Sequence, residues 1–113
     1  MSVCFEIPAL PPSLNRLLRN RALRIREPAK WDLLVRQAAR GIAPFTVPVI
    51  ITLTFYGAVD ADNHAKLVLD GIVRAGLIPD DRWPHLFELR LRARPKLVRI
   101  SACTMVEIEP CYT

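Results

Sequence analysis

The fold is decided by the stretch VIITLTFYGAVDADNHAKLVLDG, residues 49–71 of a chain of 113 residues. β-Branched and aromatic residues fill its first part, which is typical of a buried strand, and Gly57 ends that part. From Ala65 onward the apolar residues recur at helical spacing as far as Gly76, a suitable residue after a helix end. The stretch therefore predicts a strand, a short acidic connection and a helix, with Asp62 or Asn63 as N-cap.

The flanking sequence predicts the remaining elements. Alternating residues predict strands at 3–7 and 87–94, and helical spacing predicts a helix over 30–42. The same alternation predicts a strand over 98–108, turned back at Pro95 as an antiparallel hairpin. We expect a single α+β domain over residues 1–113, of order β-α-β-α-β-β, with helices on one face of a four- or five-stranded sheet.

The positive charge of the chain is local. The net charge is +5, yet residues 16–40 alone hold eight basic and two acidic residues, so the rest of the chain is slightly acidic. The segment from about 14 to 28 is a basic arm, loop or short helix, and it is either a DNA-contacting element or a solvated basic face. We favour DNA contact, because arginine forks match phosphate groups. The residues expected to contact DNA are Asn15, Arg16, Arg19, Arg21, Arg24, Arg26 and Lys30.

Carboxylates surround the predicted helix. Asp60 and Asp62 are two residues apart, so in extended chain their side chains point the same way. Asp80 and Asp81 follow the helix, and because they are adjacent at most one of them turns easily toward the first pair. Three converging carboxylates repel one another unless a divalent cation lies among them, and oxygen ligands favour Mg²⁺ or Mn²⁺. The alternative is that these acids are helix caps and solvated turns.

Polar residues also share one face of the predicted helix. Asn63, Lys66 and Asp70 are three and four residues apart, opposite the apolar stripe. The Lys66 ammonium would suit a phosphate oxygen or a developing negative charge. The spacing therefore places a cationic group beside the candidate metal ligands.

The pattern D-x-D-N-x-x-K-x-x-x-D-G at 60–71, followed by GLIPDDR at 76–82, resembles the RusA family of Holliday-junction resolvases. The segment IPALPPSLNR at 7–16 is similar to the opening strand and loop of that family. The resemblance implies a homodimeric endonuclease that uses Mg²⁺ or Mn²⁺ and cuts four-way DNA junctions. By motif position it implies metal ligands at Asp60, Asp62 and Asp81, an essential Lys66, and supporting roles next to them for Asn63, Asp70 and Asp80. The sequence departs from the family pattern at residues 83–85 and in a shortened hairpin at 94–96.

Two other functions fit the same residues. One is a structure-specific DNA-binding protein that does not cut, and the other is a different D-x-D metal-dependent phosphodiesterase or nucleotidase. No apolar run is long enough for a membrane span, and there is no signal-peptide pattern, so we expect a cytoplasmic protein of a bacterium, prophage or phage. The three cysteines have no metal-type spacing and are expected to be reduced thiols. We expect no organic cofactor.

Overall fold

The computed structural model describes residues 2–57, 64–95 and 102–111. Over these ranges the chain forms four strands and three helices in the order β-α-α-β-α-β-β, which confirms the α+β class but adds one helix to the predicted order. The elements are β1 (Val3–Ile7), α1 (Leu14–Arg19), α2 (Arg21–Ala38), β2 (Val49–Tyr56), α3 (Ala65–Arg74), β3 (Leu86–Arg94) and β4 (Cys103–Pro110).

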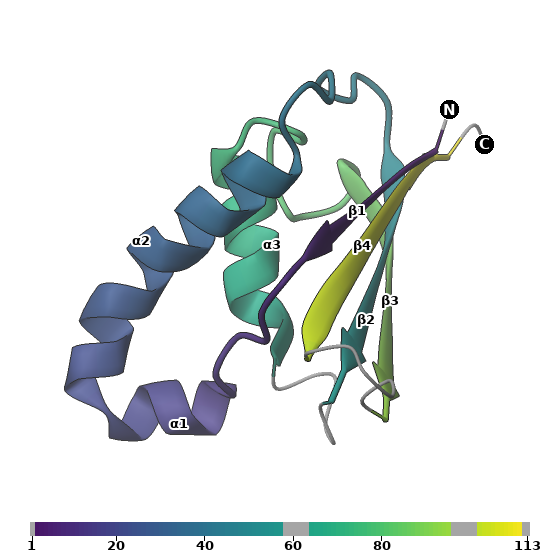
Figure 1. Ribbon diagram of the computed structural model, residues 1–113. Coiled ribbons are helices and arrows are strands. Elements are labelled where there is room, and N and C mark those ends of the chain that lie inside the picture. The colour runs from purple at the N-terminus through teal and green to yellow at the C-terminus, as the bar shows by residue number, and fades with distance from the viewer. Residues whose placement is uncertain (1, 58–63, 96–101, 112–113) are drawn as a thin grey trace.

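The four strands form one mixed sheet of order β1-β4-β2-β3, and the helices cover one of its faces (Figure 1). β3 runs parallel to β2, whereas β4 is antiparallel to both β1 and β2. The predicted hairpin between β3 and β4 is therefore wrong, because β2 lies between these two strands. β3 occupies one edge of β2 after the crossover through α3, and the other edge is left for β4. The predicted start of β4 at residue 98 lies outside the described residues.

β2 is the centre of the hydrophobic core. Its alternate residues Val49, Ile51, Leu53 and Phe55 are fully buried, as expected for a central strand whose inner face packs against helices. Trp31 of α2 is also fully buried, so its ring belongs to the core. The predicted limits of β1 and β2 are confirmed, because a strongly periodic apolar run between clear breakers defines a strand without tertiary information.

The basic segment forms α1 and the first half of α2, which Asn20 separates in extended conformation, so the helical alternative is the one observed. The Ser13 hydroxyl accepts a hydrogen bond from the Arg16 amide (3.2 Å) at the start of α1, and the Asn20 side chain caps α2 in the same way. α2 begins at Arg21, nine residues before the predicted start at residue 30, and it ends at Ala38 rather than at 42. The prediction missed the first half of α2 because Pro28 lies inside the helix and broke the expected pattern.

The end of α3 follows the sequence prediction. Gly76 has φ +81°, its amide donates to the Val73 carbonyl (3.0 Å), and the Leu77 amide donates to the Ile72 carbonyl (3.2 Å). These two bonds define a Schellman motif, and Ile72 and Leu77 are both buried beneath it. The motif fixes where the chain leaves α3 toward Asp80 and Asp81.

We expect Gly76→Ala to lower the free energy of unfolding by about 1 kcal/mol, because an L side chain disfavours this left-handed backbone. A Cβ atom at Gly76 would meet no atom within 4 Å, so the loss would come from the backbone alone. Urea unfolding measures the effect. Gly76→Asn is the matched control and should cost less, since asparagine tolerates the left-handed region. Equal losses for the two variants would contradict this explanation.

Candidate functional site

Three of the predicted site residues, Asp60, Asp62 and Asn63, lie outside the described residues. The chain is described up to Gly57, whose amide donates to the Arg94 carbonyl (2.8 Å) at the end of β2, and again from His64. His64 stands at the start of α3 with φ −112° and ψ −4°, which are helical angles, and the predicted N-cap residues Asp62 and Asn63 lie outside the described residues. The imidazole ring centre lies 5.9 Å from that of Phe55, which packs the start of α3 against the end of β2.

The structure distinguishes the two adjacent acids after α3. The Asp80 carboxylate accepts hydrogen bonds from Arg82 Nε (3.1 Å) and lies 3.0 Å from Arg82 Nη2, and this guanidinium lowers the pKa of Asp80. Asp81 is exposed and forms no ion pair with any residue in the described part of the chain. A carboxylate already held by an arginine is a poorer metal ligand than an accessible one. The geometry therefore favours Asp81 over Asp80 as the ligand from this pair.

Lys66 and Asp70 share one face of α3, as the spacing predicts. The Lys66 Nζ atom lies 3.6 Å from the Asp70 Oδ2 atom. Both residues line a hollow of about 270 Å³ between α1, α2 and α3, together with Arg24 and with Arg74, which pairs with Asp32 of α2 at 2.8 Å. The hollow thus has an apolar floor and a rim of cationic groups from two helices together with the Asp70 carboxylate.

The described residues do not bring Asp81 close to the chain that flanks Asp60 and Asp62. The Val49 amide donates to the His85 carbonyl (3.0 Å), so the segment after Asp81 lies beside the first residue of β2. Gly57, in contrast, follows the last residue of β2. The two ends of this eight-residue strand are about 25 Å apart. The chain after Asp81 therefore lies at the start of β2, whereas the described residues on either side of the D-x-D motif, Gly57 and His64, follow the end of β2 and begin α3.

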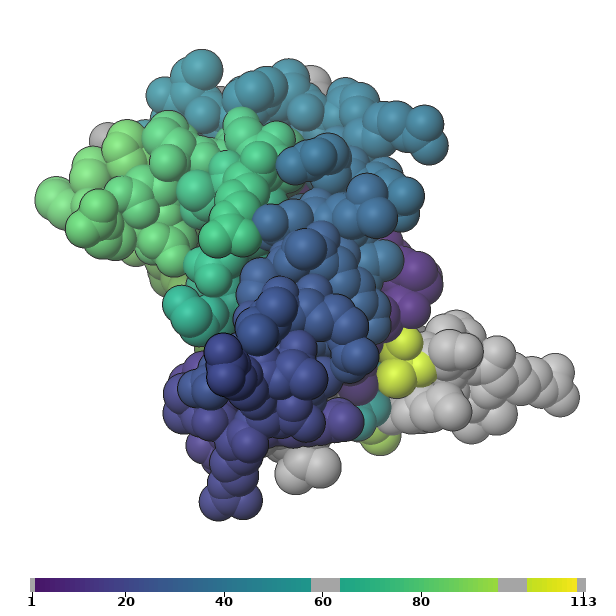
Figure 2. Space-filling view, turned by 90° about the vertical axis from the view of Figure 1, so that its left-hand side faces the viewer, coloured from purple at the N-terminus to yellow at the C-terminus, as the bar shows by residue number. Residues whose placement is uncertain are grey.

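The residues predicted to contact DNA are placed on the outer surface of α1 and of the first half of α2, which face the viewer in Figure 2. Their side chains are available to a polyanion, because all seven residues are exposed. These residues are Asn15, Arg16, Arg19, Arg21, Arg24, Arg26 and Lys30. The exposed basic residues of α1 and the first half of α2 are thus a candidate surface for phosphate groups.

Glu27 is a residue whose position the sequence reasoning missed. Its side chain is only 7% exposed, and its carboxylate lies 3.7 Å from Arg26 Nε and 3.9 Å from Lys30 Nζ. It belongs to the buried stripe of α2 that also contains Leu23 and Trp31 at four-residue spacing. The four-residue spacing could have revealed that Glu27 is on the buried side of the helix. The sequence prediction began the helix at residue 30 and so did not include Glu27 in it. The buried Glu27 carboxylate therefore partly neutralises the positive charge of Arg26 and Lys30.

Comparison with known proteins gives no family assignment, since neither a scan against models of known protein families nor a search of curated proteins finds a match. No helix in the described ranges is long and apolar enough to cross a membrane. In the same ranges, no group of three or more histidine, cysteine, aspartate or glutamate residues is placed to hold a metal ion. The interpretation of the site therefore rests on its residues and their placement.

Proposed function

We propose that this chain is a metal-dependent endonuclease that resolves four-way DNA junctions by paired nicks, acting as a homodimer in the cytoplasm. Asp60, Asp62 and Asp81 would hold Mg²⁺ or Mn²⁺, and Lys66 would bind the scissile phosphate. Support comes from the D-x-D-N-x-x-K motif and its following acidic pair. The observation that carries most weight is the contrast within that pair, since Arg82 holds Asp80 while Asp81 remains accessible.

The charge distribution supports a long polyanionic substrate. A cluster of carboxylates repels DNA, so an acidic nuclease site needs positive charge elsewhere on the protein to attract its substrate. The exposed arginines of α1 and α2 supply that charge, and they lie next to α3, the helix that begins immediately after the D-x-D motif. A small nucleotide would not need so extended a basic surface.

The proposal requires the acids at the two ends of α3 to serve one metal site. A homodimer, which the family resemblance implies, supplies a second Asp81 from the other chain. A two-fold dimer also suits a four-way junction, because both have two-fold symmetry and two equivalent strands are to be cut. We therefore propose that Asp81 acts in the site of the partner chain.

In this proposal the residues of the chain bind and orient the DNA, and the metal ion supplies the reactive water. A bound divalent ion would supply an activated water and stabilise charge on the phosphate. Lys66 would hold a non-bridging phosphate oxygen, and the Asp80–Arg82 pair would keep the Asp81 backbone in place. The arginines of α1 and α2 would bind phosphates away from the cut.

We expect the protein to nick a synthetic immobile four-way junction symmetrically in Mg²⁺ or Mn²⁺ and not in EDTA. A linear duplex of the same sequence should remain uncut. Binding should weaken steeply with salt, with a slope of log K against log[salt] of about −0.9 for each phosphate contact. Equal cutting of both DNAs would leave a metal-dependent nuclease but remove the resolvase assignment.

A second function, a junction-binding protein that does not cut, is favoured by one observation: the separation of Asp81 from the start of α3 in the single chain. Tight junction binding with no nick in either metal would establish this alternative.

A further inference from the structure

Trp83 has the most exposed large apolar side chain in the described part of the protein. The residue is 74% exposed, whereas the other tryptophan, Trp31, is fully buried. Trp83 lies in the segment between α3 and β3, which projects at one side of α2 in Figure 2 (lighter green). It is one of the residues at which the sequence departs from the resolvase pattern. The proposed cleavage chemistry gives this indole no role.

Cationic side chains lie at the same end of the molecule. Arg82 precedes Trp83 and its side chain is 83% exposed. Arg36 lies in the last turn of α2 and Arg40 two residues after its end, and both are exposed and form no ion pair with the described residues. Unpaired bases stack on exposed aromatic rings, and arginines at the same end of a protein can bind the phosphates of the strand.

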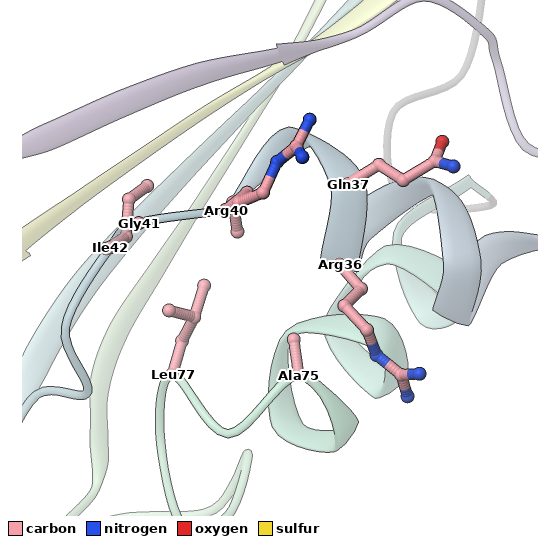
Figure 3. Close-up of a pocket in the computed structure, with 8 residues that line it drawn as sticks. Arg36, Gln37, Arg40, Gly41, Ile42, Ala75 and Leu77 are labelled. Atoms are coloured by element: carbon pink, nitrogen blue, oxygen red, sulfur yellow. The ribbon is translucent and has the colours of Figure 1, made fainter.

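A hollow of about 560 Å³ connects these arginines to the segment after α3 (Figure 3). Arg36, Gln37 and Arg40 line one side of it, and Ala75 and Leu77 line the other. In Figure 3 the Arg36 and Gln37 side chains extend outward, while Leu77 reaches toward the space between the two elements. The hollow thus has an apolar floor and a cationic rim, and its volume is within the range of small-ligand pockets, about 300–1,000 Å³.

Backbone hydrogen bonds place the hollow and Trp83 at one end of the fold. The Phe45 amide donates to the carbonyl of Leu77 (2.9 Å), and the Val49 amide donates to that of His85 (3.0 Å). Four residues of chain, at most about 14 Å, separate Phe45 from Val49. Trp83 is two residues from His85, so a short single strand can reach both the indole and the hollow.

We propose that this end of the molecule, the Trp83 surface, binds unpaired nucleotides of a DNA strand. One base stacks on the Trp83 indole, and the phosphates lie against Arg82, Arg36 and Arg40. This site is separate from the basic surface of α1 and the first half of α2, and it goes beyond the proposed nuclease activity because it requires no cleavage.

The test is a titration of the full-length protein in EDTA with oligo-dT of about 12 nucleotides, inside the site sizes known for small single-strand-binding folds. Tryptophan emission reports stacking directly, because buried Trp31 contributes a constant background. We expect oligo-dT to quench the emission and a duplex of the same length to leave it nearly unchanged. Variants that lack the Trp83 indole are compared with the wild type by the fluorescence anisotropy of a labelled oligo-dT, because they have no emission from residue 83. In that assay Trp83→Ala should weaken oligo-dT binding by about 5- to 100-fold, and Trp83→Phe should retain most of it.

Two further variants complete the test. Leu33→Ala, at another exposed apolar residue, is the matched control and should bind as the wild type does. Arg40→Gln should reduce the salt slope of oligo-dT binding by about 0.7. The blue-shifted emission of Trp31 shows that each variant is folded. Unchanged affinity in Trp83→Ala, no quenching at saturation, or an equal loss in Leu33→Ala would each overturn the proposal. These outcomes are independent of the nicking assay, since no metal is present.

Discussion

Asp81→Asn is expected to lower the rate of junction nicking by about 10²- to 10³-fold while the affinity for the junction stays within about twofold. The substitution keeps the shape of the side chain but removes the negative charge that a divalent cation requires. Gel-shift binding in Ca²⁺ or EDTA and single-turnover nicking in Mg²⁺ measure the two quantities separately. A nicking rate close to that of the wild type would exclude Asp81 as a metal ligand.

Asp80→Asn is the matched control for this experiment. It removes the same charge one residue earlier, from a carboxylate that is already held by Arg82 at 3.0 Å. We expect a loss of activity of about tenfold or less, because the remaining carbonyl oxygen can still accept a hydrogen bond from Arg82. If Asp80→Asn were the more damaging substitution, the roles assigned to these two adjacent acids would have to be exchanged.

Mixing variants determines which chain Asp81 serves. Asp81→Asn and Lys66→Ala are each expected to be inactive as homodimers. If each site combines Lys66 of one chain with Asp81 of the other, a mixed dimer has one site with both native residues and one site with neither. Single-strand nicks should therefore reappear after subunit exchange. No recovery in dimers shown to be mixed would place both residues in the site of one chain.

Gly71→Val is expected to lower the free energy of unfolding by about 2–3 kcal/mol and the melting temperature by roughly 10 °C. A Cβ atom at Gly71 would lie 2.7 Å from Val35 Cγ2 and 3.3 Å from the backbone oxygen of Trp31. Val35 is stiff at χ1 and fully buried, and the Trp31 oxygen belongs to the helix backbone, so neither can move without displacing α2. Thermal unfolding measures the loss.

A double-mutant cycle tests the steric explanation. Val35→Ala removes the methyl groups that a new side chain at Gly71 would meet. In that background the cost of Gly71→Val should fall by at least about 1 kcal/mol. Strictly additive losses would show that the close approach of α2 and α3 is not the reason for a glycine here. Gly71 belongs to the D-G pair of the family-like motif, and on this account the glycine stabilises the helix packing that holds Lys66 and Asp70 in position.

The helices and the sheet were predictable to different degrees. Alternation between clear breakers located β1 and β2, and helical spacing with a final glycine located the end of α3. The start of α2 was missed because Pro28 and Glu27 interrupt its apolar stripe, and only packing against α3 shows that the stripe continues. The predicted β3–β4 hairpin failed because local sequence does not reveal which strand edge is already occupied.

The candidate site was also predictable only in part. The residue types of the acidic motifs, Lys66 and the basic segment follow from the sequence, because charge and short-range spacing are local properties. The sequence also restricts Asp80 and Asp81 to different directions. Only the tertiary structure shows that Arg82 engages Asp80, that His85 lies beside the start of β2, and that Trp83 faces solvent. The contact with β2 joins segments that are distant in the chain, and the parallel pairing of β2 with β3 places the end of β2 and the start of β3 at opposite ends of the sheet. The Asp80–Arg82 pair is local, but the sequence does not show which of the two adjacent acids Arg82 engages.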